Sequence, residues 1–234
     1  RNEDGGLISR FYGYVADGIF QNWDEVYAHT NENGKLVQSN AQPGDIRFKD
    51  LNHDGVLDEN DKTWIGNPYP DLMVGLNLGF SYKNIDFTAN FYGTFGNDIF
   101  NKTKGLYSGV SGQNVWAGTL QKAWHEGTSN DIPRLSYNDL NQNYTRVSSF
   151  FVEDGSYMRC KLLQVGYTLP KKWLNGTELR LSLSAQNPFT ITSYSGMDPE
   201  RPQIGKDGSV IETGIDGIAY PNPRTFLFGI DLKF

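Results

Sequence analysis

Two neighbouring segments with strict two-residue alternation, residues 72–82 and 85–96, constrain the fold of this chain more than any other feature. Every second side chain is apolar, and the positions between hold mostly small, neutral residues. The apolar positions are Leu72, Val74, Leu76, Leu78, Phe80 and Tyr82, followed by Ile85, Phe87, Ala89, Phe91, Gly93 and Phe95. This alternation predicts a hairpin of two β-strands with one apolar and one polar face. Tilted strands of about 11 residues span roughly 25 Å, the height of the lipid-facing band of an outer-membrane barrel.

The same alternation recurs in three later segments, residues 157–169, 177–188 and 224–234. Their apolar faces carry Leu163, Val165, Tyr167 and Leu169, then Leu179, Leu181, Leu183 and Ala185, and finally Phe226, Phe228, Ile230, Leu232 and Phe234. In the first of these segments Arg159 and Lys161 share the parity of the apolar side chains. A lysine or arginine that faces lipid costs about 2 to 4 kcal/mol at the bilayer midplane. We therefore expect these two side chains to lie near the lipid headgroups.

The lengths of the connections predict the orientation of the five strands. The connections at Lys83–Asn84 and at Pro170–Gly176 are short, whereas those that follow the second and fourth strands are long. Outer-membrane barrels have short periplasmic turns and long outer loops. The predicted extracellular segments are therefore residues 1–71, 97–156 and 190–223, and the chain is expected to end in the periplasm.

Five strands are too few to close a barrel, for which about eight are needed. An open strand edge in lipid leaves backbone groups without hydrogen bonds, at a large cost in free energy. We therefore expect these strands to pair with others, most simply from the remaining N-terminal barrel of the same protein. The predicted fold class is all-β: the C-terminal strands of a large antiparallel transmembrane β-barrel in the outer membrane. The alternative, an open sheet in a soluble protein, would not place every long loop at one end.

Composition and single residues further limit the classes of protein to which this chain could belong. The formal net charge of −6, without a basic cluster, argues against nucleic acid as a partner. No run of 18 apolar residues occurs, so no membrane-spanning helix is expected. The single cysteine, Cys160, cannot form an internal disulfide and is expected to be a buried strand residue. The chain begins at Arg1 without a start methionine or signal sequence, so we expect a processed product, an expression product or a piece of something longer.

The sequence contains no recognisable catalytic site. His29, His53 and His125 are scattered without metal-ligand spacing, and nothing brings two carboxylates together as an acid/base pair. No serine-nucleophile motif or glycine-rich phosphate loop is present. We therefore expect that the protein is not an enzyme.

An acidic segment, residues 50–61, matches a calcium-binding loop of the EF-hand type. Gly55 stands at the sixth position, where the backbone turns sharply. Position 12 is an aspartate where the usual loop has a bidentate glutamate, and no long helix flanks the segment. A structural Ca²⁺ that pins an extracellular loop is predicted, and a solvated acidic turn is the alternative. The predicted ligands are Asp50, Asn52, Asp54, the carbonyl of Val56, Asp58 and Asp61.

Residues 114–126 have the spacing of a short amphipathic helix. Trp116, Leu120 and Trp124 recur at i, i+4 and i+8, and Gly127 supplies a stop signal. The two tryptophans could contact a sugar or a partner protein. The alternative, which we favour, is that they pack the outer loop against itself.

Several stretches resemble the SusC/RagA-like group of TonB-dependent outer-membrane transporters of Bacteroidetes-type bacteria. The most specific run, residues 43–101, includes "PGDIRFKDLNHDGVLDENDKTWIGNPYPD" and "GLNLGFSYKNIDFTANFYGTFGNDIFN". Others are "FYGYVADGIFQN", "DIPR", "SSFFVEDGSYMRCKLLQVGYTLP", "LSAQNPFTIT" and the ending "PRTFLFGIDLKF". The resemblance covers essentially the whole chain.

The resemblance implies the last five strands of a barrel of about 22 strands, with Phe234 in a terminal aromatic strand that signals assembly. It also implies an N-terminal plug, contact with TonB through that N-terminal part, and a SusD-like surface lipoprotein as partner. The expected function is import of oligosaccharides or peptides. Two alternatives stay open: a soluble calcium-stabilised β-sandwich that binds carbohydrate, and an outer-membrane protease or lipase barrel, whose catalytic triad is not found.

Overall fold

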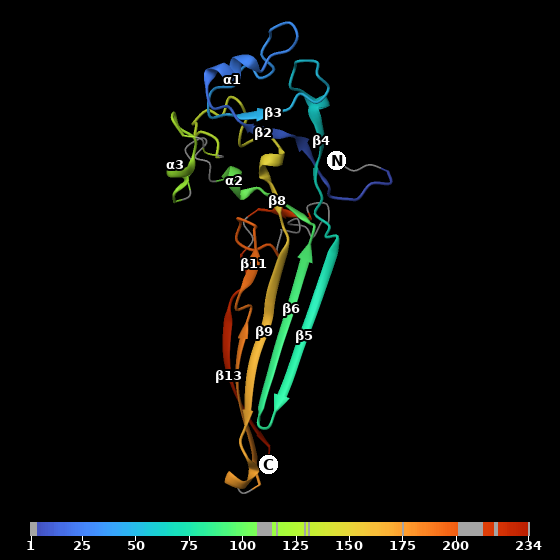
Figure 1. The fold of residues 1–234 in the computed structure, drawn as a ribbon, viewed down its shortest axis with the longest axis vertical. Helices are drawn as coiled ribbons and strands as arrows, with labels where there is room; N and C mark the ends of the chain where they lie inside the picture. The colour runs from blue at the N-terminus through green and yellow to red at the C-terminus, as the bar shows by residue number, and fades with distance from the viewer. Residues whose placement is uncertain are drawn as a thin grey trace. The chain divides into compact units, whose positions relative to one another are not determined.

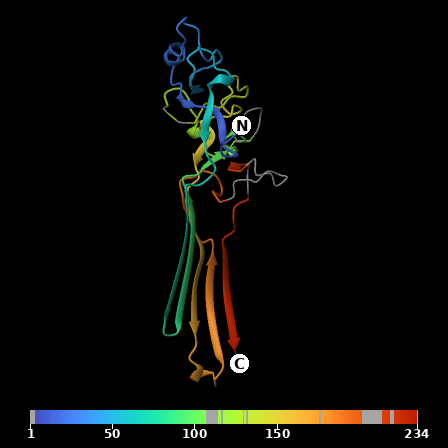
Figure 2. The ribbon, with the colours of Figure 1, turned by 90° about the vertical axis from the view of Figure 1, so that its right-hand side faces the viewer.

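Five long strands pair side by side in one antiparallel sheet (Figure 1). They are β5 (Leu72–Tyr82), β6 (Ile85–Phe95), β9 (Tyr157–Thr168), β10 (Glu178–Gln186) and β13 (Thr225–Lys233). The order across the sheet is β13-β10-β9-β6-β5, and the short strand β11 (Thr190–Thr192) pairs with the start of β9. Figure 2 shows β13, in red, running beside β10, in orange.

This computed structural model describes residues 4–106, 114–115, 117–128, 130, 132–174, 176–200, 213–217 and 220–233. The five long strands coincide to within two residues with the segments predicted from the alternation, and Phe234 lies outside the described residues. The chain divides into two units. The sheet unit comprises Tyr69–Asp98, Asp154–Pro202 and Ala219–Phe234, and the loop unit comprises Arg1–Pro68, Ile99–Glu153 and Gln203–Ile218.

The register of the sheet brings the apolar positions of all five strands onto one face. Residues directly opposite one another on neighbouring strands share a face. One continuous row across the sheet consists of Leu78, Ala89, Leu163, Ala185 and Phe226. The next row, on the other face, consists of Gly79, Thr88, Gln164, Ser184 and Leu227. The two-residue period therefore produces the apolar face and the largely polar face that the sequence predicts.

The apolar face is not covered by another layer of the described chain. Leu76 retains 47% of its accessible surface and Phe228 retains 65%. A soluble domain buries such a face against a second layer. This sheet instead presents a broad apolar surface to its surroundings.

The loop unit contains short elements around its own small cores. Its strands are β1 (Phe11–Tyr14), β2 (Ala16–Ile19), β3 (Ile46–Phe48), β4 (Lys62–Gly66), β7 (Asp98–Asn101), β8 (Val152–Asp154) and β12 (Ile215–Asp216), of which β7 and β8 begin or end at its boundary. β1 pairs with β4, β2 with β3, and β7 with β12 and β8. Tyr14, Ile46 and Phe48 form one buried cluster, and Phe20 and Val26 belong to another. The segments predicted as loops therefore contain folded structure.

In the ranges that the structure describes, the helical elements are all brief. They are α1 (Trp23–Ala28), α2 (Thr103–Leu106), α3 (Thr119–Lys122) and the 3₁₀ turns at Glu59–Asp61, Ser149–Phe151 and Lys171–Trp173. Asn22 caps α1, because its side chain accepts a hydrogen bond from the amide of Glu25 at 2.9 Å. Among the described residues, no helix has the length and apolar character needed to span a membrane.

The predicted helix over residues 114–126 is wrong, because among the residues of this range that the structure describes only Thr119–Lys122 is helical. Gly118 has a left-handed φ of 82° where the helix begins, and Ala123 is extended where it ends. Ala123 forms a parallel bridge with Ile132. A contact with a segment nine residues away therefore overrides the local helical spacing.

Candidate functional site

The polar face of the sheet is the first candidate site. Its central part carries neutral hydrogen-bonding side chains: Asn77, Thr88, Asn90, Gln164, Ser182 and Ser184. These groups can donate and accept hydrogen bonds without fixing a charged solute. Such a surface suits contact with water or with neutral polar ligands.

On the same face, near the short turns, ion pairs connect charged side chains from three strands. Arg180 on β10 pairs with Asp86 on β6, with 2.7 Å between Nη2 and Oδ2, and its Nε donates to the other carboxylate oxygen at 3.0 Å. Its Nη1 donates to Asp231 on β13 at 3.2 Å. The Arg180–Asp86 pair passes over β9 at Gly166. A Cβ at Gly166 would lie 2.4 Å from Asp86 Oδ1 and 2.5 Å from Arg180 Nη2, so a side chain there would have to displace both charged groups.

A bulge in β9 corrects the prediction for Arg159. Asn90 is opposite Leu162, but the next residue of β6, Phe91, is opposite Cys160. Lys161 is therefore a bulge residue with no partner on β6. The residues of β9 that precede it point to the face opposite to the one that strict alternation predicts. Arg159 lies opposite Tyr92 on the polar face, so the expectation that it lies among headgroups on the apolar side is wrong.

The reversed parity places Arg159 in a buried ion cluster. Arg159 is 4% exposed and Asp198 is 3% exposed, and their Nη2 and Oδ1 atoms are 2.6 Å apart. Glu200 pairs with both Arg159 and Lys161. Asn222 donates from its backbone amide to Asp198 at 2.8 Å and from its side chain to Glu200 at 3.0 Å. The cluster thus fastens the segment 198–200 and Asn222 to the strand.

The pKa of Asp198 reflects this environment. Burial raises the pKa, but hydrogen bonds from Arg159 and from the amides of Asn222 and Glu200 outweigh burial and bring it below its ordinary value. The carboxylate is therefore ionised under ordinary conditions. Its charge balances the buried guanidinium.

The acidic loop at residues 50–61 closes on its own backbone. Asp50 accepts a hydrogen bond from the amide of Gly55 at 2.7 Å. Asp61 is buried and accepts from the amides of Leu51 and Asp58, both at 2.8 Å. Asn52 accepts from the amide of Asp54 at 3.0 Å, Asp54 from that of Val56 at 2.9 Å, and Asp58 from that of Asn60 at 2.7 Å. The predicted ligand residues thus lie along one compact turn.

Three observations bear on the predicted metal. The Oδ1 atom of Asp50 is buried and has no hydrogen-bond partner within the described part of the chain. Gly55 has a φ of +78°, and a Cβ there would lie 2.0 Å from Cβ of Asn31, so the loop packs tightly at this glycine. Within the described ranges, no group of three or more His, Cys, Asp or Glu side chains is arranged to hold a metal ion. Calcium binding at Asp50–Asp61 stays a prediction.

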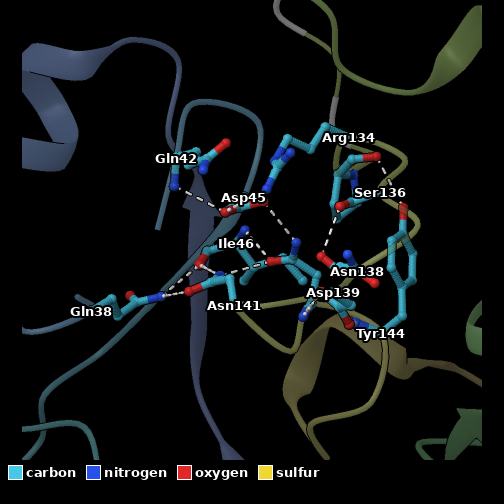
Figure 3. Close-up of polar contacts among 12 residues, drawn as sticks. Gln38, Gln42, Asp45, Ile46, Arg134, Ser136, Asn138, Asp139, Asn141 and Tyr144 are labelled. Atoms are coloured by element: carbon cyan, nitrogen blue, oxygen red, sulfur yellow. Dashed lines mark hydrogen bonds and ion pairs between the residues drawn. The ribbon is translucent and has the colours of Figure 1, made fainter. Parts of the chain in front are cut away.

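A buried polar network joins two distant segments of the loop unit (Figure 3). Arg134 Nε donates to Asp45 Oδ1 at 2.6 Å, and Asn143 Nδ2 donates to the same oxygen at 2.9 Å. The amide of Gln42 donates to Asp45 Oδ2 at 2.9 Å. Asp45 is fully buried, so these donors replace the water that the carboxylate gives up.

The network also satisfies the backbone of Ile46. Its carbonyl accepts from Gln38 Nε2 and from Asn141 Nδ2, both at 3.0 Å. Its amide donates to Asn143 Oδ1 at 2.8 Å. Side chains from residues 141–143 thus take the place of a strand neighbour for β3.

Of the two predicted loop tryptophans, Trp124 packs within the loop unit. Its Nε1 donates to Gln21 Oε1 at 3.0 Å, and its ring lies against Gly44. This arrangement supports the packing alternative for Trp124. Trp116 lies outside the described residues, and Leu120 is exposed.

The sequence reasoning missed the ion clusters at Arg180, Arg159 and Asp45. For the first cluster the sequence did contain a signal, because Asp86, Arg180 and Asp231 all stand at polar-face positions of their predicted strands. No local signal identifies the bulge at Lys161.

The chain is similar in sequence to TonB-dependent receptors. No family model matches the chain. It is 35% identical over 237 aligned residues to TonB-dependent receptor P3 of Formosa agariphila, covering 99% of this chain and 22% of that protein. It is 29% identical over 231 residues to TonB-dependent receptor SusC of Bacteroides thetaiotaomicron, covering 95% of this chain and 20% of that protein. The chain spans 20% to 25% of the length of the curated relatives it matches.

Solved structures with the same fold include the RagAB peptide transporter. The TM-score is 0.70 at 22% identity, over 98% of this chain and 23% of that chain. The RagAB peptide importer in its open-open state gives a TM-score of 0.68. This likeness confirms the predicted fold class, a set of strands from a large antiparallel β-barrel.

Proposed function

We propose, from its confirmed resemblance to SusC/RagA-like TonB-dependent receptors, that this chain supplies strands and outer loops to a nutrient importer of the outer membrane. The proposed importer takes up oligosaccharides or peptides and works with a SusD-like surface lipoprotein. Energy would reach it from TonB through an N-terminal part outside this sequence. The residues of this chain would form part of the barrel wall and its outer loops. A plug elsewhere in the protein would move to open the lumen.

The exposed apolar face of the sheet carries this proposal. Its side chains, such as Leu76 and Phe228, remain accessible although they are large and apolar. Lipid is the environment in which such a surface is stable without a covering layer. The opposite face carries polar and paired charged groups, which suits a water-filled or plugged interior.

The open edges of the sheet support the same conclusion. Within the described residues, β5 and β13 each have one neighbouring strand in this sheet. Further strands at both edges would satisfy their backbone groups and close the barrel. A soluble β-sandwich would instead pack a second sheet over the row from Leu78 to Phe226, and the described chain contains no such layer.

We also propose that residues 50–61 hold a structural Ca²⁺. The partnerless buried oxygen of Asp50 supports a cation at this position, since a buried carboxylate oxygen is stable when it is paired. Asp50, Asn52, Asp54, the Val56 carbonyl, Asp58 and Asp61 are the proposed ligands. The ion would stabilise the loop.

A matched pair of substitutions in β5 tests the membrane assignment. Leu78→Arg places a charge on the apolar face, and Asn77→Arg places the same charge on the polar face one residue away. In the full-length protein, we expect Leu78→Arg to reduce the folded, membrane-embedded fraction, because a lipid-facing arginine costs about 2 to 4 kcal/mol. Asn77→Arg should assemble normally. Equal assembly of both variants, read by heat-modifiable gel mobility of outer-membrane fractions, would contradict the proposal.

The partner and substrate require a separate experiment. Tagged full-length protein is purified from detergent-solubilised outer membranes, and co-purifying proteins and small molecules are identified by mass spectrometry. We expect a surface lipoprotein in stoichiometric amount, together with bound oligosaccharide or peptide. Purification of the assembled protein without any lipoprotein would argue against the SusD-like partner.

A further inference from the structure

The two short turns of the sheet meet at one end and carry aromatic and basic side chains. Asn84, in the β5–β6 turn, accepts a backbone hydrogen bond from Thr168 at 2.8 Å, and its side chain donates back to the carbonyl of Thr168 at 2.6 Å. Thr168 ends β9, directly before the β9–β10 turn. These hydrogen bonds tie the β5–β6 turn to the end of β9, and Figure 1 shows both short turns at the same end of the sheet.

A row that contains two tyrosines ends the apolar face of β5 and β6 at these turns, and the pair Leu179–Leu232 extends that face by one more row on β10 and β13. Tyr82, Ile85, Tyr167, Leu181 and Ile230 lie opposite one another in sequence across the five strands. The two tyrosines in this row are exposed. Beyond the row, Trp173 in the β9–β10 turn is 64% exposed. Tyrosine and tryptophan favour the level of the lipid headgroups, where one part of the ring is in hydrocarbon and the other is hydrated.

Lysines stand next to these aromatic groups. Lys83 Nζ lies 5.2 Å from the ring centroid of Tyr82, and Lys172, directly before Trp173, is exposed. Lys171 is partly neutralised by Glu178, at 3.2 Å. The other nearby acids, Asp86 and Asp231, are paired with Arg180 on the polar face. In the described part of the chain, neither Lys83 nor Lys172 forms an ion pair, so both ammonium groups are available to an anion.

We propose that Lys83, Lys172 and Trp173 form a binding site for anionic glycerophospholipid headgroups in the periplasmic leaflet of the outer membrane. The proposal rests on the proposed function, which places these short turns in the periplasm. The aromatic rings set the depth of the bilayer surface, and the two ammonium groups then lie at the level of the lipid phosphates. Their positive charge favours phosphatidylglycerol over the zwitterionic phosphatidylethanolamine.

The test compares lipid retention in variants of the full-length protein. The protein is exchanged into bilayers of equimolar phosphatidylglycerol and phosphatidylethanolamine, and the retained lipids are counted by native mass spectrometry. One lysine near an anionic surface strengthens binding by about fivefold. The double variant Lys83→Gln/Lys172→Gln should therefore lower the ratio of bound phosphatidylglycerol to phosphatidylethanolamine by about fivefold or more. Trp173→Ala should reduce retention of both lipids.

The control variant Lys35→Gln/Lys122→Gln removes the same charge from exposed positions of the loop unit. It should keep the parent's lipid ratio. An unchanged ratio in the Lys83/Lys172 variant, or an equal fall in the control, would overturn the lipid site alone, provided that the parent is assembled in the bilayer. A parent protein that fails to enter the bilayer in the same gel assay would overturn the proposed function, and this site with it.

Discussion

Arg180 and Asp86 form an ion pair across an intervening strand, with 2.7 Å between Nη2 and Oδ2. Arg180 lies on β10 and Asp86 on β6, and β9 runs between them. The pair is possible because Gly166 of β9 has no side chain at the point of crossing. One glycine therefore allows a charged link between strands that do not touch.

Substitution of this glycine should break the link. We expect Gly166→Ala to lower the free energy of unfolding of the full-length protein by about 1 to 3 kcal/mol, because the new methyl group displaces both charged side chains. Denaturant unfolding in lipid or detergent measures the change. Gly79→Ala is the control, since its Cβ position on the same face has no atom within 4 Å among the described residues. An equal effect of the two substitutions would contradict this interpretation.

The buried cluster at Arg159 predicts a strong effect of Asp198→Asn. The substitution leaves Arg159 with less negative charge to balance it, and removal of one partner from a buried ion pair costs about 3 to 5 kcal/mol. We expect the segment 198–200 to become sensitive to protease, which limited proteolysis followed by mass spectrometry would detect. Asp24→Asn, on the exposed side of α1, should have no effect. Unchanged protection in Asp198→Asn would show that the cluster does not hold this segment.

The same carboxylate predicts a loss of stability in acid. The pKa of Asp198 is lower in the folded protein than in the unfolded chain, so its contribution is complete above the unfolded pKa and declines as the pH falls. The loss should begin below about pH 4. Unfolding measured at neutral and at acidic pH should show a smaller pH dependence in Asp198→Asn than in the parent. Identical pH dependence in both proteins would rule out a contribution from Asp198.

Calcium should stabilise the loop at residues 50–61. At a concentration of one hundred times its Kd, a bound ion adds about 2.7 kcal/mol to the free energy of unfolding. We expect a chelator to lower the midpoint of thermal unfolding of the loop unit within the full-length protein, and added Ca²⁺ to restore it. Asp50→Asn should remove this response, whereas Glu32→Gln, an exposed acid outside the proposed ligands, should retain it. A midpoint of thermal unfolding that changes with neither chelator nor Ca²⁺ would contradict the proposed site.

The link between Asp45 and Arg134 should appear as energetic coupling. Arg134→Gln leaves the buried carboxylate of Asp45 without its cation, which costs about 3 to 5 kcal/mol. The double variant Asp45→Asn/Arg134→Gln should lose less stability than the sum of the single variants, because it buries no unbalanced charge. Denaturant unfolding of the four proteins measures this coupling. Strict additivity would show that the pair contributes nothing specific.

The strands and their two faces could be predicted from the sequence by itself. Side-chain direction in a strand alternates with a period of two, so the row that includes Leu78, Leu163 and Phe226 is encoded locally. The acidic loop is likewise a local pattern, and its closure from Asp50 to Gly55 involves neighbouring residues. The resemblance to TonB-dependent receptors was also evident from short runs of residues.

Only the tertiary structure decided which charged residues meet and where a local pattern gives way. The extra residue at Lys161 moves Arg159 to the polar face, at the point where β9 stops pairing with β10 and pairs with β11 instead. The helix expected over residues 114–126 is cut short because Ala123 pairs with Ile132. Asp45 and Arg134 are 89 positions apart, so no local pattern links them. Such contacts depend on the spatial arrangement of distant segments, and periodicity along the chain carries no information about it.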